Sequence, residues 1–413
     1  MQKETLSEIL NITHYYVSEI ISENKTEIHL KLEKDSECNT ICSGCEHIHK
    51  KGYHSCYEII VEDLPICGRR VFLHICKETY RCDNCKKILV EKIDWIYIRC
   101  TRRYAKQVYR LTAITTNKES GWYLGIDDEV VYRIDKRMLQ EEAKKKLVPI
   151  PAAIHISVDE VAYKKYHRYL TNVVDTDKKM IVWNEKGRKS EVLDKYYKGI
   201  GEENCKKIES VAMDGARTYI SSTEKYAVNA LIVIDRFHLM KKLNDAVDTV
   251  RKEQLKIGHK NEDEELIELT HCKQRFLLLK KKDGLTDKQK EFLTRLCKIN
   301  EPIFKAMLLK ESFLGIYECL TVEKANDYLT TWIENALKSE LQVFKEIAKS
   351  FTDKFHYILN WFRCKISSAI SEGINNKIKR LKRMAYGYKD IEYFKLKIHQ
   401  HCGLLNPKLE VAT

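Results

Sequence analysis

The sequence contains little proline and no long apolar run. Only 5 of its 413 residues are proline, and because proline interrupts helices, this scarcity indicates a chain rich in helix. No apolar run approaches the roughly 18 to 20 residues that cross a membrane, and the first residues lack the apolar core of a signal peptide. Internal repeats and low-complexity tracts are also absent. These absences predict a soluble, intracellular protein with no membrane partner.

Basic side chains outnumber acidic ones. The chain carries 73 Lys and Arg against 60 Asp and Glu, a formal charge of +13. An excess of this size favours a polyanionic partner, because phosphates attract lysine and arginine. A soluble basic protein without such a partner is the alternative. At about 150 residues per domain, the length predicts two to three domains.

Two cysteine pairs in the first 100 residues have the spacing of a zinc site. The chain holds 15 cysteines, and an odd number scattered through a long chain favours thiols and metal ligands over disulfides. Cys42 and Cys45 form one Cys-x-x-Cys pair, and Cys82 and Cys85 form another. The strand-like run 71–75 between the pairs can fold as a hairpin that brings them together. We expect the four thiolates to hold one structural Zn²⁺.

Other side chains in this region could replace a zinc ligand. They are Cys38, Cys56, Cys67, Cys76, His47 and His49. A chance pairing in a cysteine-rich chain is the alternative to a zinc site. With the turn residues and short β-like runs around it, the segment 1–100 predicts a small zinc-binding module.

Residues 101–148 have a basic, helical composition that ends before Pro149. Within them, residues 120–134 predict a helix, a tight corner at Gly125 and a second helix, as in a helix-turn-helix. The second helix of such a unit enters the major groove, so Arg133 and Arg137 are the predicted DNA contacts. An ordinary helical hairpin is the alternative.

From residue 152 the pattern becomes mixed α/β. The predicted elements are strands at 154–161, 169–174 and 180–183, a helix at 190–197, a strand ending at Asp214, a helix at 217–226 and a strand at 230–234. Three antiparallel strands followed by αβαβ fit a ribonuclease-H-like mixed sheet. Residues 237–350 then read as amphipathic helices with breaks at 282–284 and 300–302, and the part at about 255–350 is a predicted helical insertion.

Three separated carboxylates, Asp159, Asp214 and Glu372, form the predicted catalytic set. Each Asp ends a β-branched apolar run, and Glu372 lies on a predicted helix. The first and fourth strands of a ribonuclease-H-like sheet are neighbours, which would place Asp159 beside Asp214. Carboxylate oxygens suit two Mg²⁺ or Mn²⁺ ions, which support polynucleotidyl transfer. Glu160 should point to the opposite face of the strand. It would at most support the metal ligands without binding the metal itself.

The helix of Glu372 has an apolar stripe and a basic face. The stripe comprises Ile366, Ile370, Ile374, Ile378 and Leu381. Five cations follow the acid and are the expected phosphate contacts: Lys377, Lys379, Arg380, Lys382 and Arg383. Asp235 and His238 end the next strand and could support the metal site or contact DNA. A structural hydrogen-bonded pair is the alternative for these two residues.

These stretches resemble one family. SVDEVA (157–162), VAMD (211–214), VIDRFH (233–238), EGINNKIK (372–379) and RMAYGY (383–388) occur in the order found in bacterial insertion-sequence transposases of the L-three family. The resemblance covers nearly the whole chain. It implies a DDE-type catalytic domain at 152–400, with Asp159, Asp214 and Glu372 as the metal-binding triad. It also implies Cys42, Cys45, Cys82 and Cys85 as zinc ligands, although the first pair lacks the Pro and trailing Gly usual in the family.

The resemblance implies a DNA transposase of the bacterial cytosol, associated with the nucleoid. We expect it to bind the terminal inverted repeats of an insertion sequence, cleave the ends with two Mg²⁺ or Mn²⁺ ions and join them to target DNA. Pairing of two ends implies a homodimer or larger assembly. A metal-dependent nuclease on the same fold and a transposase-derived regulator without catalysis are the alternatives.

Overall fold

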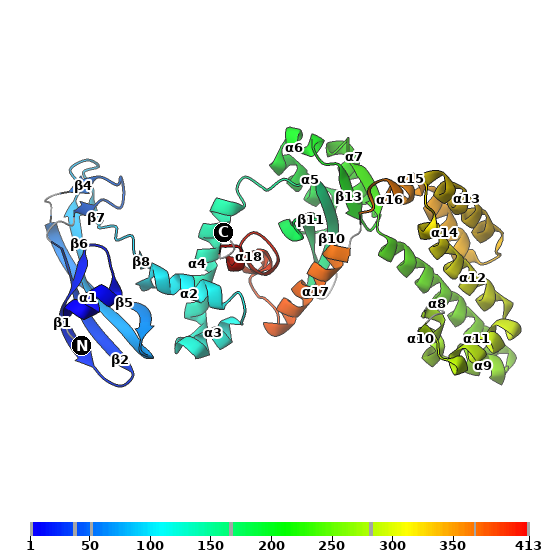
Figure 1. The fold of residues 1–413 in the computed structure, drawn as a ribbon, viewed down its shortest axis with the longest axis horizontal. Helices are drawn as coiled ribbons and strands as arrows, with labels where there is room; N and C mark the ends of the chain where they lie inside the picture. Colours follow the sequence, from blue (N-terminus) through cyan, green and yellow to red (C-terminus); the bar gives the residue numbers. More distant parts are fainter. Residues whose placement is uncertain are drawn as a thin grey trace. The chain divides into compact units, whose positions relative to one another are not determined.

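The computed structural model describes residues 3–35, 39–49, 53–164, 168–280, 284–366 and 369–410. The chain forms two compact units, and Figure 1 labels their helices and strands. Unit 1 comprises Met1–Lys145, Asp390–His401 and Leu405–Thr413, and unit 2 comprises Lys146–Lys389 and Cys402–Leu404. No helix within the described ranges is both long enough and apolar enough to span a membrane.

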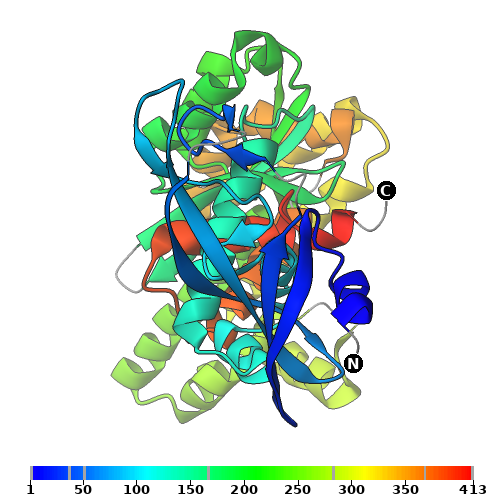
Figure 2. The same ribbon diagram turned by 90° about the vertical axis from the view of Figure 1, so that its left-hand side faces the viewer.

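Unit 1 begins with a short helix and a seven-stranded sheet, whose long strands lie nearly face on in Figure 2. The elements are α1 (Lys3–Leu10), β1 (Tyr15–Glu23), β2 (Glu27–Lys34), β5 (Tyr53–Ile66), β6 (Arg69–Arg81), β7 (Ile88–Val90), β8 (Ile96–Tyr97) and β9 (Cys100–Thr101). Their order is β1-β2-β6-β5-β9-β8, and β7 pairs with β6. A separate pair joins β3 (Thr40–Ile41) to β4 (Ile48–His49).

The predicted hairpin between the two cysteine pairs is the β5–β6 pair. Ile66 opposes Arg69, so only Cys67 and Gly68 form the turn. Both have positive φ, 50° and 78°, which is the type I′ geometry that matches the twist of paired strands. The hairpin brings the end of β6 back toward β3, and the two cysteine pairs follow these two strands.

Three helices follow the sheet: α2 (Arg102–Leu111), α3 (Asn117–Leu124) and α4 (Asp128–Lys146). Thr116 and Glu119 form a capping box at the start of α3, which satisfies N–H groups that the helix leaves open. Gly125 ends α3 with a φ of 69°. A side chain at Gly121 would approach the Ile126 carbonyl to 2.7 Å. The predicted helix, glycine corner and second helix are therefore confirmed as backbone structure.

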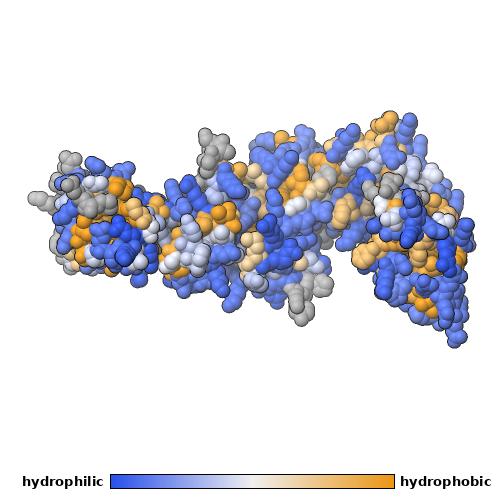
Figure 3. Space-filling view, turned by 60° about the horizontal axis from the view of Figure 1, so that its bottom comes forward, coloured by the Kyte–Doolittle hydropathy of each residue, from blue (hydrophilic) through white to orange (hydrophobic). Residues whose placement is uncertain are grey.

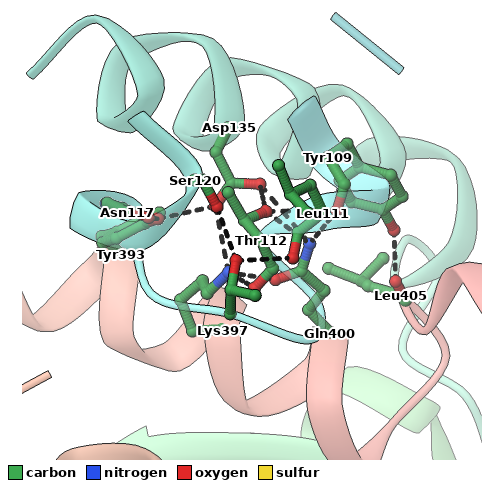
Figure 4. A network of polar contacts seen from close by, with 11 residues as sticks. Tyr109, Leu111, Thr112, Asn117, Ser120, Asp135, Tyr393, Lys397, Gln400 and Leu405 are labelled. Carbon is green, nitrogen blue, oxygen red and sulfur yellow. Dashed lines mark hydrogen bonds and ion pairs between the residues drawn. The ribbon is translucent and has the colours of Figure 1, made fainter. Parts of the chain in front are cut away.

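Helix α18 (Ile391–Cys402) packs against these three helices through a buried polar network (Figure 4). Asp135 of α4 is fully buried and Lys397 is 2% exposed, and their charged atoms lie 3.2 Å apart. Lys397 also donates to the Thr112 carbonyl at 2.7 Å, and Tyr393 donates to Asp135 at 2.6 Å. Gln400 donates to the Tyr109 carbonyl at 2.9 Å. Each buried charge in the network thus has a partner, as burial requires.

Unit 2 contains the second sheet. Its strands are β10 (His155–Lys164), β11 (Arg168–Asp175), β12 (Met180–Lys186), β13 (Ser210–Met213) and β14 (Leu231–Ile234), in the order β12-β11-β10-β13-β14. The first three pair antiparallel, and β13 pairs parallel with both β10 and β14. Every predicted strand of this region is present. The predicted adjacency of the first and fourth strands is confirmed.

Different helices contact the two faces of β10. Even-numbered residues such as Ile156 and Val158 join a core with α5 (Ser190–Ile200) and α7 (Arg217–Tyr226). Odd-numbered residues face the other way, and Asp159 bonds to α17 (Ala369–Met384). This alternation follows from the two-residue period of a strand. The predicted helices at 190–197 and 217–226 are confirmed, and a short α6 (Glu202–Lys206) lies between them.

Most helices between β14 and α17 form a bundle with its own apolar core. They are α8 (Arg236–Asn261), α9 (Glu264–Thr270), α10 (Arg275–Leu279), α11 (Asp287–Ile299), α12 (Glu301–Leu314), α13 (Val322–Lys338), α14 (Gln342–Thr352), α15 (Phe355–Leu359) and α16 (Trp361–Cys364). The predicted break at 300–302 is confirmed, with Asn300 capping α12. Of the predicted break at 282–284, residues 282 and 283 lie outside the described residues. Hydrophilic side chains cover much of the visible surface, with smaller apolar patches between them (Figure 3).

Two details of the prediction differ from the structure. The predicted apolar stripe began at Ile366, but α17 begins at Ala369 and the buried members are Ile374, Ile378 and Leu381. The predicted catalytic domain ran to residue 400, whereas residues 390–401 belong to unit 1. A short-range sequence pattern cannot tell which distant helices α18 contacts. The three-domain division otherwise stays a prediction.

The buried histidines of α18 predict acid sensitivity. Burial lowers the pKa of His399 and of His401 to about 4, whereas an unfolded histidine has a pKa of about 6.5. As the pH falls, the unfolded chain therefore binds protons at these histidines before the folded protein does. The stability that depends on neutral histidines is fully present above about pH 6.5 and is lost as the pH falls toward 4. For His399 the loss amounts to about 3 kcal/mol.

Urea unfolding at about pH 7 and pH 4.5 measures this loss. We expect His399→Leu to reduce the difference between the two pH values, and the exposed His14→Asn to leave it as in the wild type. An equal pH dependence in the wild type and His399→Leu would contradict the assignment.

Candidate active site

The two cysteine pairs meet in unit 1. All four sulfurs lie within 4.8 Å of one another. Cys42 Sγ is 3.9 Å from Cys85 Sγ, and Cys45 Sγ is 3.6 Å from Cys82 Sγ. Sulfurs bound at 2.3 Å to one tetrahedral Zn²⁺ are about 3.8 Å apart. The set therefore fits one zinc ion, and four protein ligands would close its coordination sphere.

The two pairs form turns with the same backbone geometry. Glu46 N–H donates to the Cys42 carbonyl at 2.9 Å and Lys86 N–H donates to the Cys82 carbonyl at 2.8 Å. Glu46 and Lys86 both have positive φ, 57° and 59°. A residue with positive φ directly after the second cysteine lets both thiols turn toward the same point. Burial opposes ionisation of Cys42, but N–H donors including that of Gly44 lower the pKa of its thiol to about 5.

Cys56, Cys67 and Cys76 are not members of the four-sulfur cluster. Cys56 and Cys76 form a disulfide between β5 and β6, so at this pair a disulfide is present where thiols or metal ligands were favoured. Cys67 is exposed in the hairpin turn. Cys38 and the side chain of His49 lie outside the described part of the chain.

At the second sheet, β10 positions Asp159 with both carboxylate oxygens engaged. Oδ1 accepts from the Glu160 N–H at 2.7 Å, and Oδ2 accepts from Asn375 Nδ2 at 2.7 Å. Glu160 faces the other side of the sheet, where it accepts from the Tyr219 hydroxyl at 2.8 Å. The prediction that Asp159 and Glu160 point to opposite faces is confirmed.

Asp214 and Asp235 follow two neighbouring parallel strands. Asp214 comes directly after β13, and its Oδ1 accepts from the Ala216 N–H at 2.8 Å. Gly215 has a φ of 80°, and a Cβ there would lie 3.1 Å from the side chain of Ile234. Asp235 comes directly after β14, caps α8 and lies 3.2 Å from His238 Nδ1. Because the carboxyl ends of parallel strands meet at one sheet edge, both acids lie at the same edge as Asp159.

The electrostatics of this edge favour a cation. Burial raises the pKa of Asp159, and the charges of Asp214 and Asp235 add to that rise, while the Glu160 N–H and His238 oppose it. The hydrogen bond to Asp235 raises the pKa of His238. Carboxylates that are buried and close together are costly to ionise without a compensating positive charge. The oxygen donors at this edge therefore fit a hard divalent cation.

Glu372 lies in the first turn of α17 on its exposed side. Within the described ranges, only the four cysteines form a group of three or more ligand side chains within 4.8 Å. Asp159, Asp214 and Glu372 therefore do not all meet that limit. Two ions about 4 Å apart with bonds of about 2 Å can be held by ligands about 8 Å apart. The triad stays a prediction.

All of the predicted phosphate and DNA contacts except Lys382 are exposed. Lys377, Lys379, Arg380 and Arg383 are exposed on α17. Lys382 instead donates to the Ala162 carbonyl of β10 at 3.0 Å. On α4, Arg133 and Arg137 are both exposed. Arg133 Nε donates to the Glu129 carbonyl at 3.4 Å, and Arg137 lies 3.6 Å from Glu141 and over the ring of Tyr97.

Asn375 and Asn172 are two polar residues of this site that the sequence did not single out. Both are buried, and Asn172 Nδ2 donates to Asn375 Oδ1 at 3.4 Å. A signal was present, since Asn375 lies three residues after Glu372, but its i,i+3 spacing gains meaning only once the helix is placed against β10.

Residues 156–398 match a family model described as a transposase, of the ISL3 type, and this match covers more than half of the chain. The chain belongs to the ISL3 transposase family. Asp159, Asp214, Asp235, His238 and Glu372 all lie within the matched residues. Transposases are DNA-processing enzymes, so the resemblance drawn from the five stretches is confirmed at the level of the family.

Individual relatives of this chain are also named as transposases. The transposase for insertion sequence element IS1001 of Bordetella parapertussis is 29% identical over 371 residues, covering 87% of each chain. The transposase for insertion sequence element IS1557 of Mycobacterium tuberculosis (strain CDC 1551 / Oshkosh) is 26% identical over 323 residues, covering 72% of this chain and 68% of the relative. The first similarity extends beyond residues 156–398 because it includes more residues than that match contains.

The cysteine cluster of this transposase predicts a bound zinc ion. We expect the purified protein to carry one zinc per chain, and Cys82→Ser to lose it, because three ligands leave the tetrahedral sphere open. Elemental analysis by plasma mass spectrometry measures the content. The exposed Cys67→Ser should keep its zinc, and a full zinc content in Cys82→Ser would exclude the cluster as the site.

Proposed function

We propose that this transposase binds the terminal inverted repeats of an insertion sequence, cleaves the DNA at those ends and joins the freed ends to target DNA. The convergence of Asp159, Asp214 and the Asp235–His238 pair at one sheet edge is the observation that supports this reaction. The membership of the ISL3 family supplies the class of substrate.

The second sheet is of the ribonuclease-H-like type in this proposal. Its strand order, 3-2-1-4-5 in chain order, and its parallel fourth and fifth strands support the assignment. The bundle between β14 and α17 is the helical insertion, and α17 is the last helix of the catalytic domain.

Asp159, Asp214 and Glu372 would hold two Mg²⁺ or Mn²⁺ ions, with Asp235 and His238 beside them. Such ions, when bound, activate the attacking oxygen and stabilise the leaving oxygen of an in-line displacement. The residue contribution is to fix oxygen ligands in a partly buried site, where charges interact strongly. The hydrogen bond to Asp235 raises the pKa of His238, which lies next to these carboxylates.

Two displacements at phosphorus follow in this proposal. A water oxygen attacks the phosphodiester at the element end, forming one P–O bond and breaking the bond to the 3′ oxygen, which leaves with a proton as a 3′ hydroxyl. That hydroxyl then attacks a phosphodiester of the target and displaces its 3′ oxygen. Lys377, Lys379, Arg380 and Arg383 would bind the phosphate backbone beside the acids.

Unit 1 would recognise the ends. Helix α4 follows the tight corner at Gly125, and Arg133 projects from its exposed side. We assign DNA contact to both arginines and the stronger contact to Arg133, because the exposed guanidinium of Arg137 lies 3.6 Å from Glu141 and over the ring of Tyr97. The pairing of two ends would need at least a dimer.

A metal-dependent nuclease and a catalytically silent regulator are the rival functions. A nuclease would cleave but would not join ends, and a regulator would bind ends without either product. The half-buried position of Asp159, with both oxygens held, speaks against a silent site. An assay scoring both cleavage and joining distinguishes all three.

Asp159→Ala tests the catalytic assignment. We expect it to reduce end cleavage by about 10³-fold or more, since ion-dependent stabilisation of several kcal/mol is lost, while binding to labelled end DNA persists. A Mg²⁺ cleavage assay and a gel-shift assay measure the two. The exposed Asp177→Ala serves as the matched control and should cleave normally. Wild-type cleavage by Asp159→Ala would exclude Asp159 from the site.

Arg133→Ala tests end recognition. We expect it to weaken binding to end DNA by about 1–3 kcal/mol, the usual value of one base-contacting arginine. Arg137→Ala is the comparison, and it should weaken binding less because its side chain already contacts Glu141. Fluorescence anisotropy with end DNA and scrambled DNA measures both. The opposite order of effects would overturn the choice of Arg133.

A further inference from the structure

Helix α17 reaches the catalytic edge with a buried amide as well as with Glu372. Asn375 is 6% exposed, and its Nδ2 donates to Asp159 Oδ2 at 2.7 Å. The same Nδ2 is 3.4 Å from the Glu160 carbonyl oxygen. Of the described side chains, Asn375 is the one recorded as donating directly to the Asp159 carboxylate.

We propose that Asn375 is a positioning residue, which holds the Asp159 carboxylate in the orientation that a divalent cation requires, and that Asn172 orients Asn375 in turn. This inference rests on the proposed function, because it assigns Asp159 to a metal site. Asn375 itself coordinates nothing in this proposal. Its role is to remove the rotational freedom of a ligand.

The orientation of the Asn375 amide is determined by its two partners. An ionised carboxylate can only accept, so the NH₂ group of Asn375 must face Asp159. Its carbonyl oxygen then faces away and accepts from Asn172 Nδ2 at 3.4 Å. Asn172 is 1% exposed, and its own carbonyl oxygen has no hydrogen-bond partner in the described structure. A buried polar atom left unpaired is costly, and the donor of Asn172 nevertheless faces Asn375.

The two contacts of Asp159 engage both of its carboxylate oxygens. Oδ1 is held by the Glu160 N–H and Oδ2 by Asn375. Each carboxylate oxygen has two lone pairs, so one on each remains for a cation. Partners that orient a metal ligand typically change metal affinity or activity by about 10- to 100-fold when removed. The neutral amide does this without adding a charge to an already acidic edge.

The hydrogen bond from Asn375 to Asp159 also affects the distance between the Asp159 and Glu372 carboxylates. Asn375 lies one helical turn after Glu372, so fixing Asn375 against β10 also fixes the turn that carries Glu372. Lys382 provides a second attachment two turns further on, through its 3.0 Å bond to the Ala162 carbonyl. Helix α17 is thereby held to β10 by Asn375 and by Lys382. Glu372 lies one turn before Asn375.

Mn²⁺ binding to the zinc-loaded full-length protein, without DNA, tests this role. We expect Asn375→Leu, which keeps the volume but removes the donor, to raise the dissociation constant for Mn²⁺ by about 10- to 100-fold. Electron paramagnetic resonance of free Mn²⁺ measures the affinity. Asn376→Leu, on the exposed side of the same helix, is the matched control and should keep the wild-type affinity.

A cleavage assay separates positioning from packing. In Asn375→Leu, the half-saturating Mg²⁺ concentration should rise about as much as the Mn²⁺ dissociation constant, while the rate at saturating metal approaches that of the wild type. A packing defect would instead lower the rate at every metal concentration. If Asn375→Leu does not fold, Asn375→Ser replaces it, because the serine hydroxyl is too short to reach Asp159.

The outcomes have distinct meanings. Weakened Mn²⁺ binding by a folded Asn375 variant, with normal binding by Asn376→Leu, supports the proposal. Wild-type affinity in a folded Asn375 variant overturns it and leaves the proposed function standing. The proposed metal site fails if the wild type binds no Mn²⁺, or if Asp159→Ala binds Mn²⁺ as tightly as the wild type. This inference then fails with it.

Discussion

The parallel pairing of β10 with β13 is the constraint that brings Asp159 and Asp214 to the same edge of the sheet. His155, Ile156 and Ser157 pair with Ser210, Val211 and Ala212, so the two strands run side by side and their following residues emerge at the same edge. A shift of one residue along β10 would turn Asp159 toward the apolar core and Val158 toward α17. The buried residues on the even-numbered face of β10 prevent that shift, because they would lose their core contacts.

The sequence was sufficient to predict the second sheet and its main helices. Apolar β-branched runs identified all five strands, and the boundaries of α7 agree with its predicted range. The cluster of four cysteines was predictable because two Cys-x-x-Cys pairs restrict how the thiols can point. Local patterns succeeded wherever the property they report, such as the spacing of two cysteines or the alternation of a strand, is itself local.

Long-range partners could not be predicted in the same way. The Cys56–Cys76 bond depends on the register of β5 and β6, which no spacing rule supplies. Asn375 and Asn172 meet across 203 residues. Arg137 and Lys382 carry positive charge like their neighbours, and only the folded structure shows that one contacts Glu141 and the other a carbonyl. Composition predicts a basic surface but does not tell which of its members are already occupied.

Helix α18 has a consequence for how the molecule is made. Its buried Lys397 and Gln400 bind Asp135 and the carbonyls of α2, more than 250 residues earlier in the chain. When only residues 1–148 have emerged from the ribosome, α2 and α4 therefore do not yet have α18 packed against them. Unit 1 would therefore be completed only after residues 146–389 have been synthesised, because α18 follows them in the chain.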